Sequence, residues 1–582
     1  MKHLIVSVVC GLLGVACVGV TGPSTSWNNP GEPGPVAPSD TTAPVVTILE
    51  PAGPVFVEGD TLRVTGQVQD DSPVRLLAGS TEVELAADGS FSFDLVAAPG
   101  AHRLRFTAID APGNEGYAYV AAMMGQYGDA EALVPHAISM ELGSEAMTDL
   151  SYGTSRMLEG MDLGPYVRDA NPVAEGSWGE VNVQSVDYEM LALSLLPASG
   201  SLRAQGAIQD LDIGLELESY LDLTGSVRAT RVVFDADIEV QARDGRVVAE
   251  IIEQDVTVEG FIADIDNFPG FIESLVSGLV EDLVERKVEE ALAAELPSAL
   301  EDAMMQIPSG HTVDIFGSGV EIVTEISEVD LSPAGIFLDV AATAYPSVRP
   351  IGDGTEFMAP GPLRLTDGSA PPRSMAEVAA NISLDAINAM TFNAWAGETL
   401  NFRIDEIPFG SGNATLAALA FISPELRTLA PLDTPLSVEI AMGLPPVVVG
   451  DGNALMLQCA EVRLNFIARI ESGEQSVVSL SLGLNADLSV ELGAAMSAGE
   501  LSFLVEDLLL TGDLFEGPES FGQGPDLDAL LRSLSRPLTE KLGALQGLQI
   551  PTVYGFGFAA QEARHLNGFV HVEGSLDYTP EG

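Results

Sequence analysis

Histidine and cysteine, the side chains that most often carry acid–base, nucleophilic or metal chemistry, are few in this chain and are not spaced for it. None of the six histidines forms the His-x-x-x-His or His-Glu-x-x-His spacing that places two imidazoles on one helix face to bind zinc. The sequence also lacks a Gly-x-Ser-x-Gly nucleophile elbow, a Walker loop and a Cys-x-x-Cys pair. We therefore expect a protein that is not an enzyme and that has no cofactor and no metal site.

Carboxylates dominate the charged residues, since 85 Asp and Glu stand against 25 Lys and Arg, which gives a net charge of −60. This sign repels nucleic acid and disfavours docking on an anionic membrane surface, because both are bound through Lys and Arg. A large negative charge is typical of a soluble protein whose molecules repel one another. The alternative is that the charge gathers calcium or cationic ligands. Asp70 and Asp71 with Asp110 could hold calcium. Carboxylates in turns are usually only solvated, and we expect that state for these three.

The first 20 residues predict an export signal. Lys2 and His3 precede a mostly apolar run that is short for a membrane span and is followed by Gly and Pro. This run contains Leu-Gly-Val-Ala-Cys, ending at Cys17, which resembles a bacterial lipoprotein signal. We expect acylation of Cys17 and a location in the outer membrane, periplasm or cell surface, with simple secretion as the alternative. Cys459, in an apolar stretch without a neighbouring histidine, is expected to be a buried structural thiol.

Short strands separated by turns fill the N-terminal part of the chain. A Pro/Gly/Ser linker at residues 21–43 is followed by alternating apolar and polar residues over 44–125, with a hairpin signal at Asp88-Gly89-Ser90. Strands at this spacing without helices predict an antiparallel sandwich. The "DGSF" turn and the closing "A-x-D-x-x-GN" resemble the immunoglobulin-like modules of bacterial surface proteins, which usually act as stalks or adhesive spacers.

Amphipathic helices and alternating strands share residues 130–350. Residues 142–160 predict a short helix, and residues 271–296 predict a helix of roughly 39 Å at 1.5 Å per residue. Pro297 should end or kink the longer helix, with a second helical piece after it. The apolar side chains of this helix recur every three or four residues, so they must cover an equally long apolar surface. Long alternating strands on either side of the helix can provide that surface.

A Gly/Pro-rich stretch at residues 351–373 predicts a boundary, after which the order of elements returns over 374–580. A short helix from Leu384 to Ala396 begins the second half, with Ser383 as its N-cap and Gly397 as its stop.

The second half continues with strands and one more helix. Apolar residues from Leu480 to Leu492 keep the two-residue period of a strand. Residues 527–545 predict a second amphipathic helix, interrupted by Pro537. Helix, sheet, long helix and strands thus occur twice, which is an internal repeat of architecture.

This order of elements resembles the family of bactericidal/permeability-increasing protein, lipopolysaccharide-binding protein and cholesteryl ester transfer protein. The first half carries "FPGFIESLVSGLVEDLVERKVEEALAAEL", and the second carries "ISLDAINAMTFNAWAGETLNFRI" and "LLRSLSRPLTEKLGALQGLQIPTVYGFGFAAQEARHLNGFVHVEGSLDY". The resemblance implies an α+β fold with two tubular lipid-binding domains, in each of which a bent antiparallel sheet wraps a long helix. With the N-terminal all-β immunoglobulin-like sandwich, these make up the expected fold. The chain departs from the family in lacking the cysteines for its usual disulfide and in replacing a basic cluster with acidic residues.

The expected function is the non-catalytic binding or transfer of acyl-chain lipids in apolar tunnels. A 16-carbon chain buried at ~0.8 kcal/mol per methylene gains about 12 kcal/mol before ordering costs. The expected partners are phospholipid or fatty-acyl lipids and a membrane reached through the anchor, but not nucleic acid. The rival interpretation is a structural or adhesive surface protein whose tubular domains are packed and free of lipid. The residues expected to contact lipid are Ile272, Leu275, Leu279, Leu283, Ile387, Met390, Leu531, Leu534 and Leu538.

Overall fold

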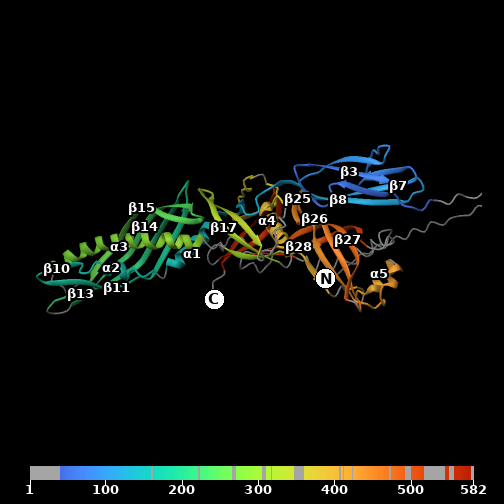
Figure 1. Cartoon of the computed structure of the whole chain (residues 1–582). Helices are drawn as coiled ribbons and strands as arrows, with labels where there is room; N and C mark the ends of the chain where they lie inside the picture. The colour runs from blue at the N-terminus through green and yellow to red at the C-terminus, as the bar shows by residue number, and fades with distance from the viewer. Residues whose placement is uncertain are drawn as a thin grey trace, which may run out of the picture.

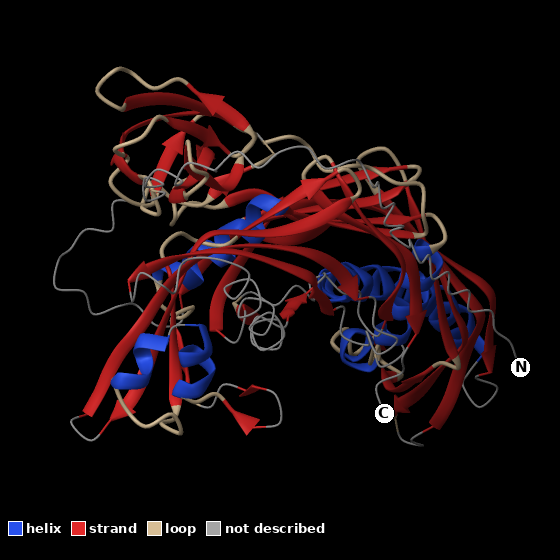
Figure 2. Ribbon diagram, turned by 90° about the vertical axis from the view of Figure 1, so that its right-hand side faces the viewer, coloured by secondary structure: helices blue, strands red, loops and turns tan. Residues whose placement is uncertain are grey.

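The protein is an elongated, arched molecule built mainly from strands (Figures 1 and 2). In the computed structural model, strands make up 62% and helices 16% of the described residues. Among the described residues, no helix combines the length and the apolar character needed to cross a membrane. The structure describes residues 40–158, 161–219, 223–264, 270–304, 310–315, 318–346, 359–366, 368–405, 408–409, 412–422, 424–470, 473–491, 500–516, 544–549 and 556–578.

Residues 45–127, here called the N-terminal unit, form two sheets around a small core of their own. One sheet has the order β1-β3-β6, and the other has the order β19-β8-β7-β4-β5 with β2 paired in parallel to β8. Val64, Leu76 and Phe106 are fully buried between them. Strand β19 comes from far along the chain, at Leu363–Arg364. The unit's own strands are β1 Val45–Glu50, β2 Val55–Glu58, β3 Thr61–Gln69, β4 Val74–Ala78, β5 Thr81–Val83, β6 Ser90–Val96, β7 Gly100–Asp110 and β8 Glu115–Tyr127.

A six-stranded antiparallel sheet with three helices forms one end of the arch. Its order is β10-β11-β13-β14-β15, and β12 pairs with β13 beside β11. The alternating residues Val232, Phe234, Ala236 and Ile238 are buried, as their two-residue period predicts. The elements are α1 Ala146–Leu158, α2 Gly164–Arg168, β10 Ala174–Gly176, β11 Gly179–Asp187, β12 Met190–Pro197, β13 Leu202–Glu218, β14 Leu223–Arg243, β15 Arg246–Asp264 and α3 Gly270–Met304.

A 14-stranded sheet forms the middle and the other end of the arch. Its order is β21-β24-β26-β27-β28-β29-β16-β17-β18-β9-β20-β31-β30, with β25 paired to β26. Helix α4, Leu384–Ala396, packs against it, and α5 is Leu416–Ile422. The strands are β9 Val134–Gly143, β16 His311–Ile315, β17 Ser318–Ser332, β18 Gly335–Pro346, β20 Val378–Ser383, β21 Phe402–Ile404, β24 Leu436–Met442, β25 Val447–Asp451, β26 Ala454–Ile470, β27 Gly473–Glu491, β28 Glu500–Glu516, β29 Ala544–Gln549, β30 Phe556–Leu566 and β31 Phe569–Tyr578; a small hairpin, β22 Pro408–Phe409 and β23 Gly412–Asn413, stands apart.

The 14-stranded sheet joins the two halves of the chain. Strand β9 of the first half lies between β18 and β20, and β16 pairs with β29 of the second half. Apolar side chains from both halves therefore belong to one core cluster, for example Ile138, Leu338, Ile382 and Val570.

The expected fold class is wrong. The described chain is mostly β, with curled sheets, and a long helix wrapped by a sheet is not seen. Helix α3 packs mainly against the edge strand β15 and against α1 and α2. Glu301 of α3 accepts a hydrogen bond from the backbone N–H of Ala249, and Glu285 accepts one from Val258, at 2.9 and 3.3 Å. These carboxylates satisfy donors of a sheet edge, so the helix closes an open edge instead of filling a tube.

Several local predictions agree with the structure. Helix α4 runs from Leu384 to Ala396, and the Ser383 side chain accepts a hydrogen bond from the N–H of Asp385, as the predicted N-cap requires. The alternating residues from Leu480 to Leu488 are buried in β27. Pro297 lies inside α3, which continues through it to Met304. The helix predicted at residues 527–545 falls almost wholly outside the described residues, and the two at its end, 544 and 545, belong to strand β29.

Candidate functional site

A surface groove of about 630 Å³ runs between helix α1 and strand β12. Strand β12 alternates along its length, with Leu191, Leu193 and Leu195 buried and the residues between them exposed. Two of the exposed positions are also large and apolar, because Met190 is 43% and Leu196 is 48% exposed. The groove therefore combines a buried leucine row with an apolar rim that is open to solvent.

Two serine hydroxyls of α1 hold the free edge of β12. Ser151 Oγ accepts a hydrogen bond from the N–H of Leu195 at 2.8 Å, and Ser155 Oγ accepts one from the N–H of Leu193 at 3.1 Å. Each hydroxyl donates its own proton to a carbonyl one turn earlier in α1, on Met147 and Ser151. Serines four residues apart lie on the same helix face, so α1 takes the place of a neighbouring strand.

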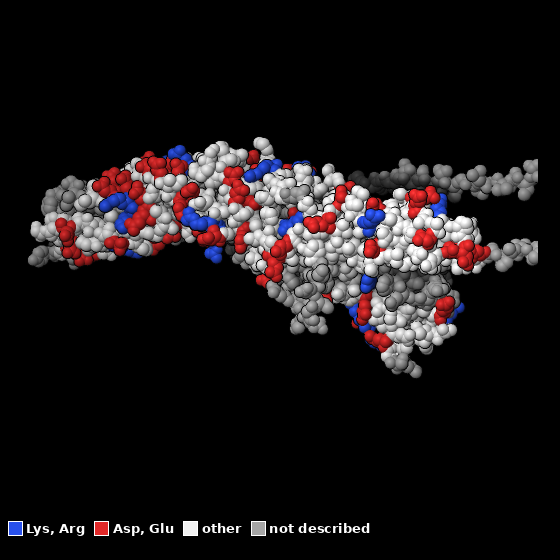
Figure 3. All heavy atoms as spheres, turned by 45° about the horizontal axis from the view of Figure 1, so that its top comes forward, with Lys and Arg blue, Asp and Glu red and all other residues white. Residues whose placement is uncertain are grey.

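The described lining of the groove contains no carboxylate. Of the sixteen described residues that line it, none is Asp or Glu, and the one charged side chain is Arg156. The Arg156 guanidinium lies 5.8 Å from the centroid of the Tyr152 ring, which is itself 47% exposed. On the face of the molecule shown in Figure 3, Asp and Glu recur between stretches of uncharged surface.

A second hollow of about 610 Å³ adjoins the groove through Met190, and its character is different. Asp162, Asp187 and Glu189 are among the residues that line it. Tyr188 closes one side, and its hydroxyl donates to the carbonyl of Met161 at 2.8 Å. The end of the groove near Met190 is therefore acidic, whereas the groove itself is apolar.

The space beneath α4 is almost completely filled. A cavity there, called the α4 chamber, has a volume of about 20 Å³, which is room for about one water molecule. Its walls are apolar except for Thr343. In this state the α4 chamber is too small for an acyl chain. Its lining residues are Val134, Ala137, Ile138, Ile322, Ala342, Thr343, Ala344, Ile382, Ala386, Ala389 and Met390.

The predicted lipid-contacting residues are spread over several environments. Met390 lines the α4 chamber, and Ile387 is buried beside it in α4 without lining it. Leu283 is buried under α3, whereas Leu279 is 41% exposed. Their contact with lipid stays a prediction. The side chains of Ile272 and Leu275, and all of Leu531, Leu534, Leu538 and Cys17, lie outside the described residues.

The residues that shape the groove were missed in the sequence. Alternation over Met190–Pro197 and the helical pattern of 142–160 were both visible there, but nothing local pairs the helix with the strand. The usable signal is the spacing of Ser151 and Ser155, two hydroxyls on the side of α1 that also carries buried Met147 and Leu150.

The described histidine and cysteine side chains that are buried have structural surroundings. His571 lies between Asn381 Oδ1, at 2.7 Å from its Nδ1, and Glu573 Oε1, at 3.0 Å from its Nε2. The hydrogen bonds from His571 and Ser374 lower the pKa of Glu573. Cys459 is buried, as expected, and burial raises the pKa of its thiol to about 12, so it stays protonated.

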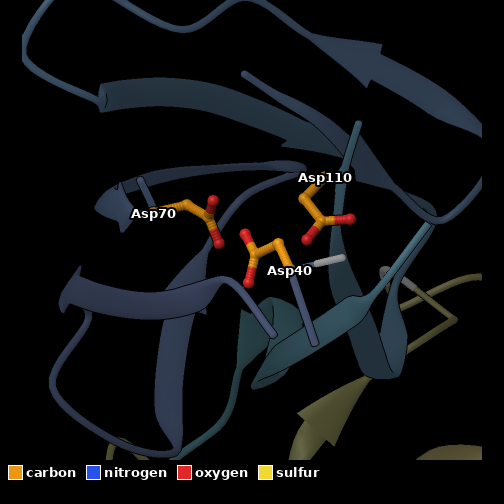
Figure 4. A group of neighbouring side chains, drawn as sticks. All are labelled: Asp40, Asp70 and Asp110. Atoms are coloured by element: carbon orange, nitrogen blue, oxygen red, sulfur yellow. The ribbon is translucent and has the colours of Figure 1, made fainter. Parts of the chain in front are cut away.

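Three carboxylates of the N-terminal unit and its approach face one another: Asp40, Asp70 and Asp110, with oxygen atoms within 4.8 Å (Figure 4). Asp40 thus replaces the expected Asp71. Burial favours a higher pKa for Asp110, but hydrogen bonds from the side chain and N–H of Asn114 and the N–H of Gly113 outweigh it, and the pKa is lowered. Oxygen ligands of this kind suit calcium, but acidic groups are also common without an ion, and the three carboxylates alone do not assign one.

Comparison with known proteins gives distant structural similarity alone. No family model and no curated protein sequence matches the chain. Lipopolysaccharide-binding protein is similar at 15% identity and a TM-score of 0.41, over 77% of this chain and 100% of that one. P47 of Clostridium botulinum E1 has 8% identity and a TM-score of 0.25 over the same shares, and latherin has 10% and 0.22 over 28% of this chain and 89% of its own. At these scores the similarities assign neither a ligand nor an activity.

Proposed function

We propose that the protein binds single-chain acyl amphiphiles in the groove between α1 and β12, without catalysis. The observation that carries the proposal is that this groove has an apolar, exposed rim and no carboxylate among its described lining residues, in a chain of net charge −60. Exposed large apolar side chains gathered at a hollow are typical of a binding surface.

The size and charge of the groove indicate the kind of ligand. Its volume of about 630 Å³ lies within the roughly 300–1,000 Å³ usual for one small ligand, which suits one chain better than a lipid with several. Helix α1 has 13 residues and is roughly 20 Å long at 1.5 Å per residue, so an extended chain can lie along it. Arg156 adds the positive charge that a fatty-acid carboxylate would meet.

Binding fits the groove's polar groups better than catalysis does. The hydroxyls of Ser151 and Ser155 are engaged with backbone groups of β12 and α1, and no histidine is among the described residues that line the groove. A serine nucleophile needs a base within hydrogen-bond reach. We therefore propose a non-catalytic role, and from the export signal and Cys17 a location at the bacterial envelope, with secretion as the alternative.

One observation favours the rival function, a structural or adhesive surface protein. The α4 chamber has only about 20 Å³, so the described residues around it leave no room for an acyl chain in this state. The rival function requires that the groove also stay empty when the protein is offered acyl chains.

The deciding experiment measures lipid in the groove. Lipid is extracted from the purified protein with organic solvent and identified by mass spectrometry, and the protein is titrated with a fluorescent fatty acid. The variant M190D/L196D, which places two carboxylates at the exposed rim, is measured in the same way. Because a charge in an apolar site costs several kcal/mol, we expect at least a tenfold loss of affinity in the variant. I262D, at an exposed apolar position on β15, is the matched control and should bind like the parent protein. Absence of extracted lipid together with absence of uptake would refute the proposal.

A further inference from the structure

The N-terminal unit is fastened to the second half by a buried polar cluster. Arg103 of β7 is 8% exposed and forms an ion pair at 3.1 Å with Glu461 of β26, which is 2% exposed. Ser481 of β27 accepts from Arg103 at 2.9 Å and donates to Glu461 at 2.7 Å. The Arg103 guanidinium also stacks 3.5 Å from the centroid of the Tyr119 ring. A buried ion pair with all its partners in place fixes one geometry, and losing one partner is strongly destabilising.

An apolar contact surrounds this polar cluster, so the unit is not a separate stalk. Ala101, Ala121 and Met123 of the unit share a core cluster with Leu444 and Val447 of the second half. Figure 1 shows the unit lying along β25 and β26 and away from α3. The unit is therefore held against the second half over an extended face.

Helix α4 is held at its N-terminal end through strand β19. Leu363 and Arg364 pair with Tyr127 and Gln126 of β8, so this segment is part of the unit's sheet. The two residues that follow turn toward α4, where the N–H of Leu365 and the N–H and hydroxyl of Thr366 donate to the carboxylate of Asp385, the second residue of the helix.

The C-terminal end of α4 is held by an aromatic contact from the same unit. The ring of Phe56, next to β8 in strand β2, lies 5.9 Å from the ring of Trp395 and 5.8 Å from the ring of Tyr127. Twelve of the 13 residues of α4 are buried, which requires cover on every side of the helix. Ala386, Ala389 and Met390 of the same helix line the α4 chamber.

From these contacts we infer that the N-terminal unit is a clamp that presses α4 onto the 14-stranded sheet and keeps the α4 chamber shut. Release of the unit removes the contacts of β19 and Phe56 with α4 and leaves the hydrogen bonds of Asn388 to Val448 and of Trp395 to Met442. The helix can then shift on the sheet, and an acyl chain enters the chamber between Met390 and the strands. This inference rests on the proposed function, the binding of acyl amphiphiles, but it concerns the α4 chamber and not the groove between α1 and β12. If the chamber is open about 1% of the time in the clamped protein, its apparent affinity is about 100-fold below that of the released protein.

Trp395 lies in α4, the helix that contributes Met390 to the chamber, and reports an acyl chain near this helix through the quenching of its fluorescence by dibromostearic acid. The full chain is used with Trp27 and Trp178 changed to Phe, so that Trp395 is the remaining tryptophan. In this background R103A removes the guanidinium through which the unit contacts Glu461 and Ser481, leaves buried Glu461 with Arg463 as its remaining ion-pair partner, and should release the unit. R103M/E461L removes both charges and should keep the unit docked, since apolar replacements of a buried pair are often tolerated.

We expect quenching of Trp395 in R103A at fatty-acid concentrations up to about 100-fold lower than in the parent or in R103M/E461L. Hydrogen exchange at residues 363–366 reports release independently, and F56A provides a milder second release variant. Equal quenching in the parent and the released variants, or release without quenching, would overturn the clamp. If neither variant loosens residues 363–366, the cluster and Phe56 do not hold the unit, and the inference fails. Adding M190D/L196D separates the two sites, because it removes groove binding and leaves quenching of Trp395 unchanged.

Discussion

Replacing Ser151 and Ser155 with alanine tests whether helix hydroxyls hold the edge of β12. In the parent protein each hydroxyl accepts one backbone N–H of the strand, from Leu195 and Leu193. Alanine keeps the helix and its packing but leaves both N–H groups without a partner. The strand should therefore separate from α1 more often, although the remaining structure is unchanged.

The magnitude follows from two opposing effects. Each buried N–H that loses its partner costs about 1–3 kcal/mol, whereas alanine is favoured over serine in a helix by about 0.5 kcal/mol. For the two substitutions together, the contact between α1 and β12 is weakened by roughly 1–5 kcal/mol. The value should lie near the lower end of this range, because water from the open groove can reach the freed N–H groups. We expect about 2 kcal/mol, which is roughly a 30-fold change in the opening equilibrium.

Hydrogen exchange of residues 190–197 measures this opening directly, because the amides of an edge strand exchange when it opens locally. The exchange of Leu193 and Leu195 should accelerate roughly 30-fold in S151A/S155A. T148A, at an exposed position of α1, and S151T/S155T, which keeps both hydroxyls, should exchange like the parent protein. Unchanged exchange in S151A/S155A, with α1 still helical, would refute the proposed role of the hydroxyls.

Three further perturbations have defined outcomes. Because burial raises the pKa of Cys459 to about 12, the native protein should resist alkylation by iodoacetamide at pH 8 and react fully only in denaturant. Hydrogen bonds from Arg403 and Arg469 lower the pKa of Glu474 to about 2 from an ordinary value of 4.5. Ionised Glu474 therefore stabilises the folded protein above pH 4.5, and this stabilisation is lost as the pH falls toward 2. E474Q should therefore unfold more readily than the parent in urea at pH 4.5 and above, and the difference should vanish near pH 2. L283A, which empties a buried site under α3, should lower the free energy of unfolding by about 2–5 kcal/mol in urea titrations.

The controls for these three use the same measurements. Alkylation of native Cys459 at the rate of a free thiol would contradict its burial. A difference between E474Q and the parent that persists unchanged at pH 2 would contradict the ion pair as its cause. L279A, at an exposed position of the same helix, should cost less than about 1 kcal/mol, and an effect equal to that of L283A would contradict the assigned face of α3.

Local signals in the sequence were sufficient for individual elements. Ser383 and Gly397 bracket a helix because a hydroxyl satisfies an early N–H, and the N–H groups of Gly397 and Glu398 donate to the carbonyls of Asn393 and Trp395. Leu480 to Leu488 predict a strand because successive side chains point to opposite faces. Such signals lie within a few residues of one another, so they can be found without knowing the fold.

Pairing between distant strands could not be found in this way. Nothing near Ile138 or Ile382 specifies that β9 and β20 are neighbours, and this pairing makes one sheet from two expected domains. The helix at 271–296 was predicted, but its apolar face is compatible with two arrangements. In one a sheet encloses the helix, and in the other the helix packs against the edge of a sheet. Glu301 and Glu285, which determine the answer through their bonds to β15, look like solvated residues in the sequence.

The position of β9 in the middle of the large sheet also determines when the chain can fold. The side chain of Asn381 donates to Ser139 across 242 residues of sequence, and both are buried. A ribosome delivers β9, which ends at Gly143, well before β18, which begins at Gly335, so its apolar face has neither neighbouring strand while the intervening third of the chain is made. Folding of the central sheet is therefore a late, whole-chain event, and contacts of such high sequence separation make it slow. The high negative charge keeps such unfinished chains apart, which gives the acidic composition a purpose before the native structure exists.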